Sequence, residues 1–374
     1  MPKKLTPLLA LLLIPLLLTL PAAASTSAAA AALLLADSGL PLYLQNADTP
    51  LPMASTTKIM TALVAIEQGD LEQEIEISAA AAAAEGSSLY TREGERYTLE
   101  QLLYGLLLRS GNDCAVAIAE GVAGDVATFV DRMNERAASL GLTATHFENP
   151  SGLDAEGHRT TARELALITA EAMKNETFAA IFATKHHQIP ATATHDARYL
   201  ENKHRLLRLD ATGELIGGKT GYTRASGRSL VTVARRGEAT LIAVTINDPD
   251  DWRDHQALLH RGFSGVQPVD LAALVPETAL PLAGGGTLTA GTVASHTVVL
   301  PADTTPTVSL RLPRFCYSTT SLLQPVGEAV VRLGDKELAR LPLVCLKKDS
   351  REEKMSIFQL IRRAWCSIIN WVVV

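Results

Sequence analysis

The order of apolar segments between about residues 28 and 262 is the feature that most constrains the fold. AAAALLLAD and LPLYLQN flank Ser38 and Gly39, which is typical of a β-hairpin. TLEQLLYGLLL, CAVAIAEGVA and TARELALITAEAMKN follow and have apolar residues at helical spacing. RSLVTVARRGEATLIAVTIND then predicts two strands joined at Arg236 and Gly237. This order predicts an α/β (α+β) domain in which helices cover one antiparallel sheet.

The composition changes after residue 265. Three consecutive glycines from Gly284, many threonines and short alternating runs such as TVSLRLP replace the helical patterns. The run AVVRLGDKELARLP predicts a hairpin that turns at Gly334 and Asp335. We therefore expect a first domain over residues 25–265 and a small all-β sandwich over residues 266–348. A chain of 374 residues is long enough to give each domain its own core.

The N-terminal residues 1–24 are expected to lie outside the fold. Lys3 and Lys4 precede a leucine-rich run, and three alanines ending at Ala24 follow it, which is typical of a secretory signal peptide. A signal anchor is the alternative, but the apolar run is short for a membrane-spanning helix. We therefore expect the protein to be exported.

The C-terminal residues 349–374 predict an amphipathic helix. Arg362 and Arg363 lie in its middle, which disfavours a transmembrane helix. Trp365 and Trp371 with a cationic face favour the membrane interface, and packing on the protein's own core is the alternative. We expect a peripheral protein on the outer face of the cytoplasmic membrane.

Charge and cysteine content exclude some partners. The net charge of −6 argues against nucleic acid, which requires a basic surface. Four scattered cysteines, including Cys114 and Cys366, do not indicate a disulfide scaffold or a metal site, so we expect no metal and no other cofactor. Cys316 and Cys345 could pair, and two free buried thiols are the alternative.

Three short motifs carry the candidate chemistry. They are S-x-x-K at Ser55 and Lys58, S-x-N at Ser110 and Asn112, and K-T-G at 219–221. An S-x-x-K sequence alone is expected about once by chance in a chain of this length. The three motifs in this order, with a helix starting at the first and a strand at the third, are the signature of penicillin-recognising serine enzymes.

The spacing of Ser55 and Lys58 suits nucleophilic catalysis. Residues three apart share a helix face, so the amine can reach the hydroxyl. A serine hydroxyl is a weak nucleophile that needs an adjacent base, and a lysine can be that base when its pKa is lowered. A second cation such as Lys219, desolvation and the helix N-terminus would each lower it. A capping serine and a solvated lysine are the alternative.

Ser110 and Asn112 are expected to assist the reaction. The Ser110 hydroxyl would relay a proton to the departing amine, the alternative being a loop or capping hydroxyl. The Asn112 amide offers both a donor and an acceptor, which suits holding a substrate amide and Lys58 together. A turn asparagine after glycine is the alternative.

The K-T-G strand is expected to recognise the substrate. Lys219 and Thr220 would present a cation and a hydroxyl to a carboxylate, and an ordinary strand-entry turn is the alternative. The backbone N–H groups of Ser55 and Tyr222 would form an oxyanion hole. The ring of Tyr222 could be either a pocket wall or an exposed side chain.

From about Ala29 to Phe263 the chain resembles the serine-type D-alanyl-D-alanine carboxypeptidases, the low-molecular-mass penicillin-binding proteins. The resemblance implies the penicillin-recognising serine-enzyme fold, and the predicted β-domain and C-terminal helix match the family's arrangement. The sequences that carry it are LQNADTPLPMASTTKIMTALVA, GSSLYTREGERYTLEQLLYGLLLRSGNDCAVAIAE, FENPSGLDAEGHRTTARELA, GGKTGYTRASGRSLV and DWRDHQALLHRGF.

The resemblance implies acyl transfer on peptidoglycan stem peptides that end in D-Ala-D-Ala. Ser55 would attack the penultimate D-Ala carbonyl and Lys58 would accept its proton. The terminal D-Ala would leave, and water would hydrolyse the acyl-enzyme. β-Lactams, which mimic the dipeptide, would acylate Ser55 and act as inhibitors. The residues expected to bind the substrate are Lys219, Thr220, Gly221, Tyr222, Thr223 and Arg253.

Four alternatives concern these expectations. A class A-like β-lactamase needs a glutamate followed four residues on by asparagine, and here Gly152 follows Glu148 at that spacing. A DD-endopeptidase that cuts cross-links would use the same chemistry. An inactive β-lactam or peptidoglycan binder would not need Ser55 and Lys58 intact. For Arg253, an exposed arginine at a helix start is the alternative to carboxylate binding.

Overall fold

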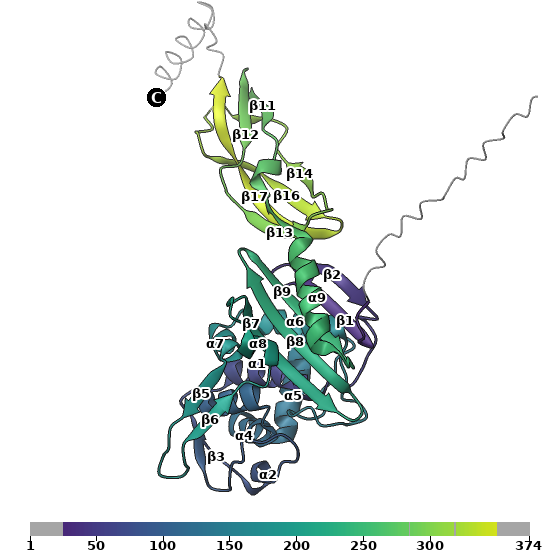
Figure 1. Cartoon of the computed structure of the whole chain (residues 1–374). Coiled ribbons are helices and arrows are strands. Elements are labelled where there is room, and N and C mark those ends of the chain that lie inside the picture. Colours follow the sequence, from purple (N-terminus) through teal and green to yellow (C-terminus); the bar gives the residue numbers. More distant parts are fainter. Residues whose placement is uncertain (1–24, 284, 318, 350–374) are drawn as a thin grey trace, which may run out of the picture.

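The computed structural model describes residues 25–283, 285–317 and 319–349. A body of helices and sheet is followed by an all-β region that extends away from it (Figure 1). The predicted fold class, an antiparallel sheet covered by helices and followed by an all-β domain, is confirmed. The predicted signal peptide and C-terminal amphipathic helix lie outside the described residues. Within those residues, no helix is both long enough and apolar enough to cross a bilayer.

The central sheet has five antiparallel strands in the order β2-β1-β9-β8-β7. Every residue of β1 and β9 is buried, because these inner strands are covered on both faces. The predicted hairpin at Ser38 and Gly39 joins β1 to β2, and the predicted turn at Gly237 joins β8 to β9. β7, which carries the K-T-G motif, is an edge strand. The strands are β1 (Ala30–Leu35), β2 (Pro41–Gln45), β7 (Leu215–Thr223), β8 (Gly227–Arg236) and β9 (Ala239–Ile246).

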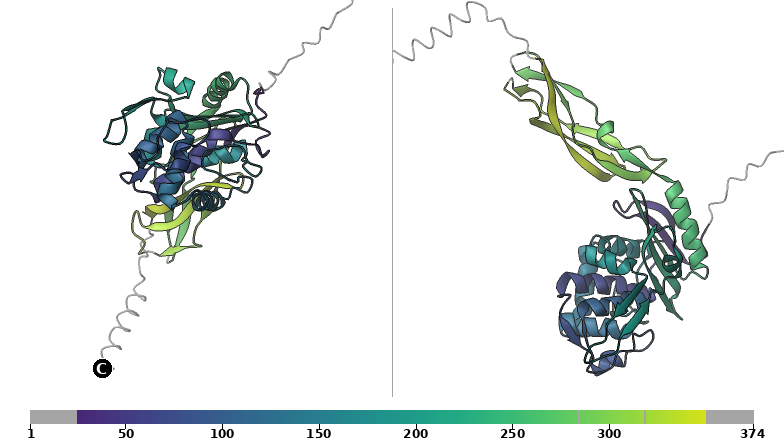
Figure 2. Two further views of the ribbon diagram at one scale, coloured as in Figure 1. Left: turned by 90° about the horizontal axis from the view of Figure 1, so that it is seen from below. Right: turned by 60° about the vertical axis from the view of Figure 1, so that its left-hand side comes forward.

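A layer of helices covers one face of this sheet (Figure 2). Its centre is α1, which packs against α4, α5, α6 and α7 and is buried from Lys58 to Ala65. A helix surrounded in this way must be apolar on nearly all sides, which explains the run IMTALVAI. The helices of the layer are α1 (Lys58–Gln68), α3 (Leu99–Tyr104), α4 (Asn112–Ala123), α5 (Val126–Ser139), α6 (Ala162–Ala172) and α7 (Glu176–Ala183).

Helix α9 (Asp251–Ser264) packs on the opposite face of the sheet (Figure 2). Leu258 and Leu259 of α9 contact the cluster of Leu33 and Leu241, whose side chains point away from the helical layer. The smaller elements of this body are β3 (Glu74–Glu76), α2 (Ala79–Ala82), β4 (Arg96–Thr98), β5 (His186–Ile189), β6 (Arg198–Glu201) and α8 (Arg205–Leu209).

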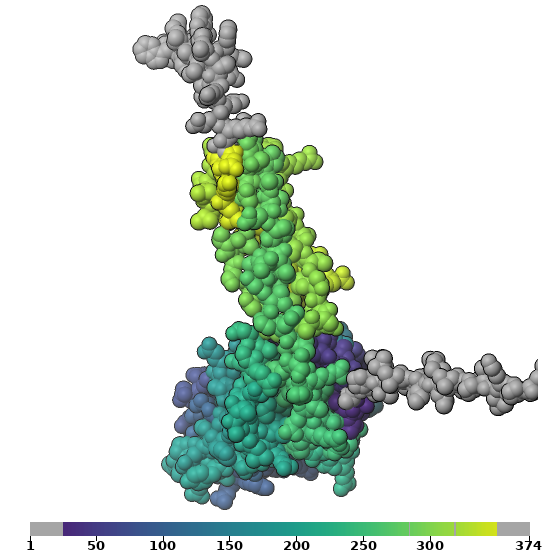
Figure 3. Space-filling model, turned by 45° about the horizontal axis from the view of Figure 1, so that its top comes forward, coloured from purple at the N-terminus to yellow at the C-terminus, as the bar shows by residue number. Residues whose placement is uncertain are grey.

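The all-β region forms a narrower extension of the molecule (Figure 3). It contains a six-stranded sheet in the order β14-β16-β17-β12-β11-β15 and the pair β10-β13. The predicted hairpin at Gly334 joins β16 to β17. Cys316 and Cys345 are buried in one cluster as free thiols, and Cys114 is also free. The elements are β10 (Val266–Asp270), η3 (Ala272–Leu274), β11 (Thr278–Ala283), β12 (Thr287–Gly291), β13 (Thr297–Pro301), β14 (Thr307–Arg311), β15 (Cys316–Tyr317), β16 (Pro325–Leu333) and β17 (Lys336–Asp349).

A buried hydrogen-bonded chain ties α8 and α9 to the sheet. The Leu207 N–H donates to His204 Nδ1 at 3.0 Å, so the imidazole proton is on Nε2 and is donated to Thr232 Oγ1 at 2.8 Å. The Thr232 hydroxyl therefore donates to His255 Nδ1 at 2.7 Å, and His255 Nε2 donates to Thr245 Oγ1 at 3.0 Å. Burial lowers the pKa of His204 to about 3 and lowers that of His255 well below its usual value. Both imidazoles are therefore neutral in the folded protein.

From the two buried, neutral imidazoles we predict that acid destabilises the fold at a pH above the range in which carboxylates titrate. An unfolded histidine binds a proton near pH 6.5, whereas buried His204 and His255 stay neutral. The free energy of unfolding should therefore fall as the pH drops below about 6.5, by about 1.4 kcal/mol per pH unit for each histidine. Urea unfolding between pH 6.5 and pH 5 measures this slope. His255→Asn should reduce this slope by about 1.4 kcal/mol per pH unit, which corresponds to one proton. The replacement of the exposed His260 by Asn should leave the slope unchanged. Equal slopes in the two variants would contradict the account.

Candidate active site

The predicted nucleophile and base lie at the junction of a 3₁₀ turn and a helix. Ser55 is in η1 (Ala54–Thr57), and Lys58 is the first residue of α1. Side chains three apart on a 3₁₀ turn are eclipsed, which places the serine directly beside the lysine. Lys58 Nζ lies 3.0 Å from Ser55 Oγ. Ala54, directly before the serine, has a φ of +49°, a strained conformation of the kind that clusters at functional sites.

The amine of Lys58 has three neutral oxygen partners. Besides Ser55 Oγ, it contacts Asn112 Oδ1 at 2.7 Å and the backbone carbonyl of Ser151. The lysine side chain is fully buried, and burial is the main cause that lowers its pKa to about 7. Lys203 lowers the pKa further, while Cys114 and Asp113 raise it. Lys58 can therefore be a neutral base near neutral pH.

The S-x-N motif lies where a π-helical turn ends. The turn η2 (Gly105–Arg109) stops at Ser110, which has a φ of +62°, and α4 begins at Asn112. The orientation of the Asn112 amide is fixed, because its Nδ2 donates to the Glu85 carbonyl at 2.5 Å and leaves Oδ1 for Lys58. Single π turns are frequent at functional sites, and here the turn presents Ser110 to the next motif.

Lys219 links the K-T-G strand to the S-x-N motif. Its Nζ donates to Ser110 Oγ at 2.9 Å and to the Thr220 carbonyl at 2.8 Å. The side chain is almost completely buried, so burial lowers its pKa well below the usual value, and Lys58 and Lys203 lower it further. A carboxylate that entered beside Lys219 would favour its charged form.

Gly221 lies directly against the nucleophile turn. A Cβ atom at Gly221 would be 3.2 Å from the backbone nitrogen of Ser55 and 3.1 Å from the carbonyl oxygen of Met53. The absent side chain therefore lets the edge strand β7 approach the backbone of Ser55 closely. This contact places the amides of Ser55 and Tyr222 in neighbouring segments, as the predicted oxyanion hole requires.

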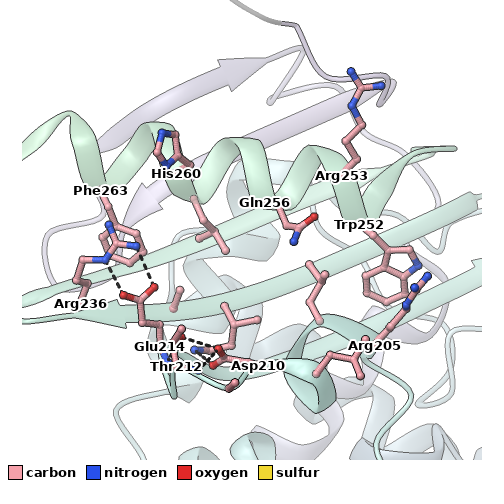
Figure 4. Close-up of a pocket in the computed structure, with 16 residues that line it drawn as sticks. Arg205, Asp210, Thr212, Glu214, Arg236, Trp252, Arg253, Gln256, His260 and Phe263 are labelled. Carbon is pink, nitrogen blue, oxygen red and sulfur yellow. Dashed lines mark hydrogen bonds and ion pairs between the residues drawn. The ribbon is translucent and has the colours of Figure 1, made fainter.

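Three of the predicted substrate-binding residues are exposed, bonded to another side chain or far from Ser55. The ring of Tyr222 is 68% exposed, so it is at the surface. Thr223 Oγ1 lies 2.7 Å from a carboxylate oxygen of Asp154, so its hydroxyl already has a partner. Arg253 is on α9, across the sheet from α1, at the rim of a cavity of about 680 Å³ (Figure 4). The structure therefore does not bring Arg253 together with Ser55, and its side chain is exposed at the start of a helix.

Three residues contribute to the site without belonging to the three motifs. Lys203 Nζ donates to Ser87 Oγ at 2.8 Å, and this amine lowers the pKa values of Lys58 and Lys219. Asp113 is completely buried and accepts the N–H groups of Leu89 and Thr91, which holds the loop beside Asn112. Ser151 contributes a backbone carbonyl. Asp113 directly follows the S-x-N motif, which could have drawn attention to it, but no motif marks Lys203 or Ser151.

Comparisons with known proteins point to one family. Residues 19–250 match the family model for D-alanyl-D-alanine carboxypeptidase. The D-alanyl-D-alanine carboxypeptidase DacF of Bacillus subtilis is 36% identical over 220 residues, which cover 56% of this chain and 54% of that protein. DacB2 of Mycobacterium tuberculosis is 36% identical over 236 residues, which cover 61% of this chain and 79% of that protein. The chain thus spans about half the length of the first relative.

Solved structures show the same similarity. A variant of the Streptomyces K15 DD-transpeptidase matches with a TM-score of 0.61 and 32% identity, over 64% of this chain and 99% of that one. Penicillin-binding protein 5 from Haemophilus influenzae matches with a TM-score of 0.68 and 25% identity, over 87% of this chain and 98% of that one. The second match extends over the all-β region as well as the first body.

Gly152 offers a test of this geometry. It has a φ of +86°, and a Cβ atom there would be 2.0 Å from the Ala54 carbonyl oxygen. Gly152→Ala should therefore displace the Ala54–Ser55 peptide and slow acylation of Ser55 by benzylpenicillin by about 10²-fold. Gly124→Ala is the matched control, because its φ is +88° and nothing lies within 4 Å of the added Cβ.

The control separates backbone strain from displacement of Ser55. Gly124→Ala should lower the free energy of unfolding by about 1–2 kcal/mol and leave the acylation rate unchanged. Urea unfolding and rapid-mixing acylation kinetics measure the two effects. Equal acylation rates in folded Gly152→Ala and Gly124→Ala would refute the proposed contact.

Proposed function

The chain belongs to the D-alanyl-D-alanine carboxypeptidase family of serine peptidases, and from this premise we propose that it removes the terminal D-alanine from peptidoglycan stem peptides. The observation that carries the proposal is the buried amine of Lys58, 3.0 Å from the hydroxyl of Ser55. A neutral amine in that position can accept the serine proton as the hydroxyl oxygen attacks.

Acylation begins at the bond between the last two D-alanines. Ser55 Oγ attacks the carbonyl carbon of the penultimate D-Ala while Lys58 Nζ takes the hydroxyl proton. The backbone N–H groups of Ser55 and Tyr222 stabilise the oxyanion of the tetrahedral intermediate. The contact between Gly221 and the Ser55 nitrogen supports this pair of donors.

The peptide C–N bond then breaks and its nitrogen needs a proton. The Ser110 hydroxyl, which accepts a hydrogen bond from Lys219 Nζ at 2.9 Å, suits a relay that passes the proton taken by Lys58 to the departing D-alanine and leaves Lys58 neutral again. Water then attacks the acyl carbonyl, gives a proton to the base, and the Ser55 oxygen recovers its proton as the shortened peptide leaves. Ser55 and Lys58 thereby return to the protonation states in which they began.

The substrate carboxylate is recognised by the K-T-G strand. Lys219 and Thr220 supply a cation and a hydroxyl, and Thr223 can add its hydroxyl if it exchanges its bond to Asp154 for the substrate. The buried position of Lys219 without a carboxylate partner among its hydrogen bonds supports this assignment, because an entering anion would compensate its charge. Arg253 has no part in the proposal because of its place on α9.

The proposed partners and location follow from the same assignment. β-Lactams mimic the terminal dipeptide and acylate Ser55 as inhibitors. Export by residues 1–24 would deliver the enzyme to the peptidoglycan, and residues 349–374 would hold it peripherally on the outer face of the cytoplasmic membrane. The extended β-domain supports this location, since it separates the catalytic body from the end of β17 (Figure 1).

Two measurements on the mature chain test this function. Intact mass after addition of benzylpenicillin should show one adduct that maps to Ser55, and a synthetic pentapeptide ending in D-Ala-D-Ala should release free D-alanine. Ser55→Ala should abolish both results because it removes the attacking oxygen. Drug consumed without a lasting adduct would favour a β-lactamase. Folded protein that forms no adduct, consumes no drug and releases no D-alanine would exclude the enzyme.

A further inference from the structure

The loop of residues 149–153, between α5 and α6, supplies a partner of Lys58 that the motifs do not include. The Ser151 carbonyl accepts a hydrogen bond from Lys58 Nζ. Its neighbour Gly152 packs against the peptide that joins Ala54 to Ser55. One short loop therefore touches both the base and the backbone of the nucleophile.

Asn149 organises this loop through its side chain. Its Oδ1 accepts the backbone N–H of Gly152 at 2.7 Å and the N–H groups of Ser151 and Leu153 at 3.2 Å. Its Nδ2 donates to the Leu153 carbonyl at 2.9 Å, so both ends of the amide are used. The three N–H groups face inward around one oxygen, and this turns the carbonyl of Ser151 outward toward Lys58.

The loop is also anchored to α1 itself. The hydroxyl of Thr61, one turn after Lys58, donates to the Pro150 carbonyl at 2.7 Å. Pro150 has a fixed φ, so the loop has little freedom between Asn149 and Ser151. The position of the Ser151 carbonyl relative to Lys58 therefore depends on the bonds of Asn149.

We propose that Asn149 is a positioning residue for the base, holding the Ser151 carbonyl so that the lone pair of Lys58 Nζ is directed at Ser55 Oγ. A neutral amine has two N–H groups and one lone pair. Asn112 Oδ1 and the Ser151 carbonyl accept the two N–H groups, which leaves the lone pair for the serine proton. The proposal rests on the proposed function, because it gives the loop a role in that reaction.

Loss of the Ser151 carbonyl has two consequences for Lys58. An N–H group would then point at Ser55 Oγ in part of the population, and the ammonium formed during the reaction would lose an acceptor. Hydrogen bonds to a charged form favour it, so loss of the carbonyl lowers the pKa of Lys58. The titratable groups around Lys58 are Asp113 and Cys114 on α4, Lys203 before α8, Lys219 on β7 and His158 before α6.

Acylation kinetics of the full mature chain between pH 5 and pH 9 test the proposal. Asn149→Ala should lower the plateau rate constant for benzylpenicillin by about 10²-fold and move the acidic limb to lower pH. Asn149→Asp keeps an oxygen acceptor for the three N–H groups and should remain within about tenfold of wild type at the plateau. Its carboxylate should move the acidic limb to higher pH, the opposite direction.

Asn134→Ala is the matched control for a purely structural effect. Asn134 also uses its side-chain amide to hold a neighbouring backbone, but both of its bonds, each 2.9 Å, go to Phe147 and not to the loop of residues 149–153. It should lower the melting temperature without moving the pH profile. If Asn149→Ala does not fold, Asn149→Ser, which keeps a shorter oxygen acceptor, should show the same shift to a smaller extent.

The outcomes separate this inference from the proposed function. Wild-type protein that is not acylated would refute the function and the inference together. Acylated wild type with an unchanged rate and pH profile in Asn149→Ala, or in the folded Asn149→Ser where that variant is needed, would refute the inference alone. Equal losses in Asn149→Ala and Asn149→Asp would also overturn it, because the oxygen acceptor would then have no influence.

Discussion

A charged amine is costly to bury when its partners are neutral, and the amine of Lys58 is fully buried among three neutral oxygens. This cost lowers its pKa to about 7, so the neutral form that can accept a proton is available at neutral pH. The helical layer maintains that burial, because α4, α5, α6 and α7 pack around α1. The neutral form of Lys58, on which the proposed reaction of Ser55 relies, therefore depends on the packing of the first body.

The same burial would favour the anionic substrate that is proposed for the site. Lys203 lowers the pKa of both Lys58 and Lys219, and Lys58 also lowers that of Lys219. The nearby carboxylate of Asp113 binds Ser88 and the backbone of the adjoining loop instead of forming an ion pair with a lysine. A substrate carboxylate would thus enter a group of amines that has no bonded anion among the contacts described for Lys58 and Lys219, and its negative charge would favour their protonated forms.

The sequence predicted the architecture and brought forward the side chains that are proposed to react, because both leave patterns of residue type. Periodicity located the sheet hairpins, and spacing within three motifs identified Ser55 and Lys58 before any distance was known. Contacts made by backbone atoms have no such pattern, so the Ser151 carbonyl could not be found. Arg253 is a residue of a type that suits a carboxylate, but it lies on α9. Long-range packing decides which face of the sheet α9 covers, and a sequence pattern does not reveal that face.

The pKa of Lys58 is the quantity that tests the account most directly. The side-chain ¹³Cε and ¹⁵Nζ signals of isotopically labelled lysine report each amine's protonation, and Lys58→Arg identifies the signal by its loss. The account predicts a titration midpoint near 7 for Lys58 in the free enzyme. A midpoint near the ordinary value of about 10.4 would mean that the amine is charged at neutral pH, and Lys58 could not then be the base that activates Ser55.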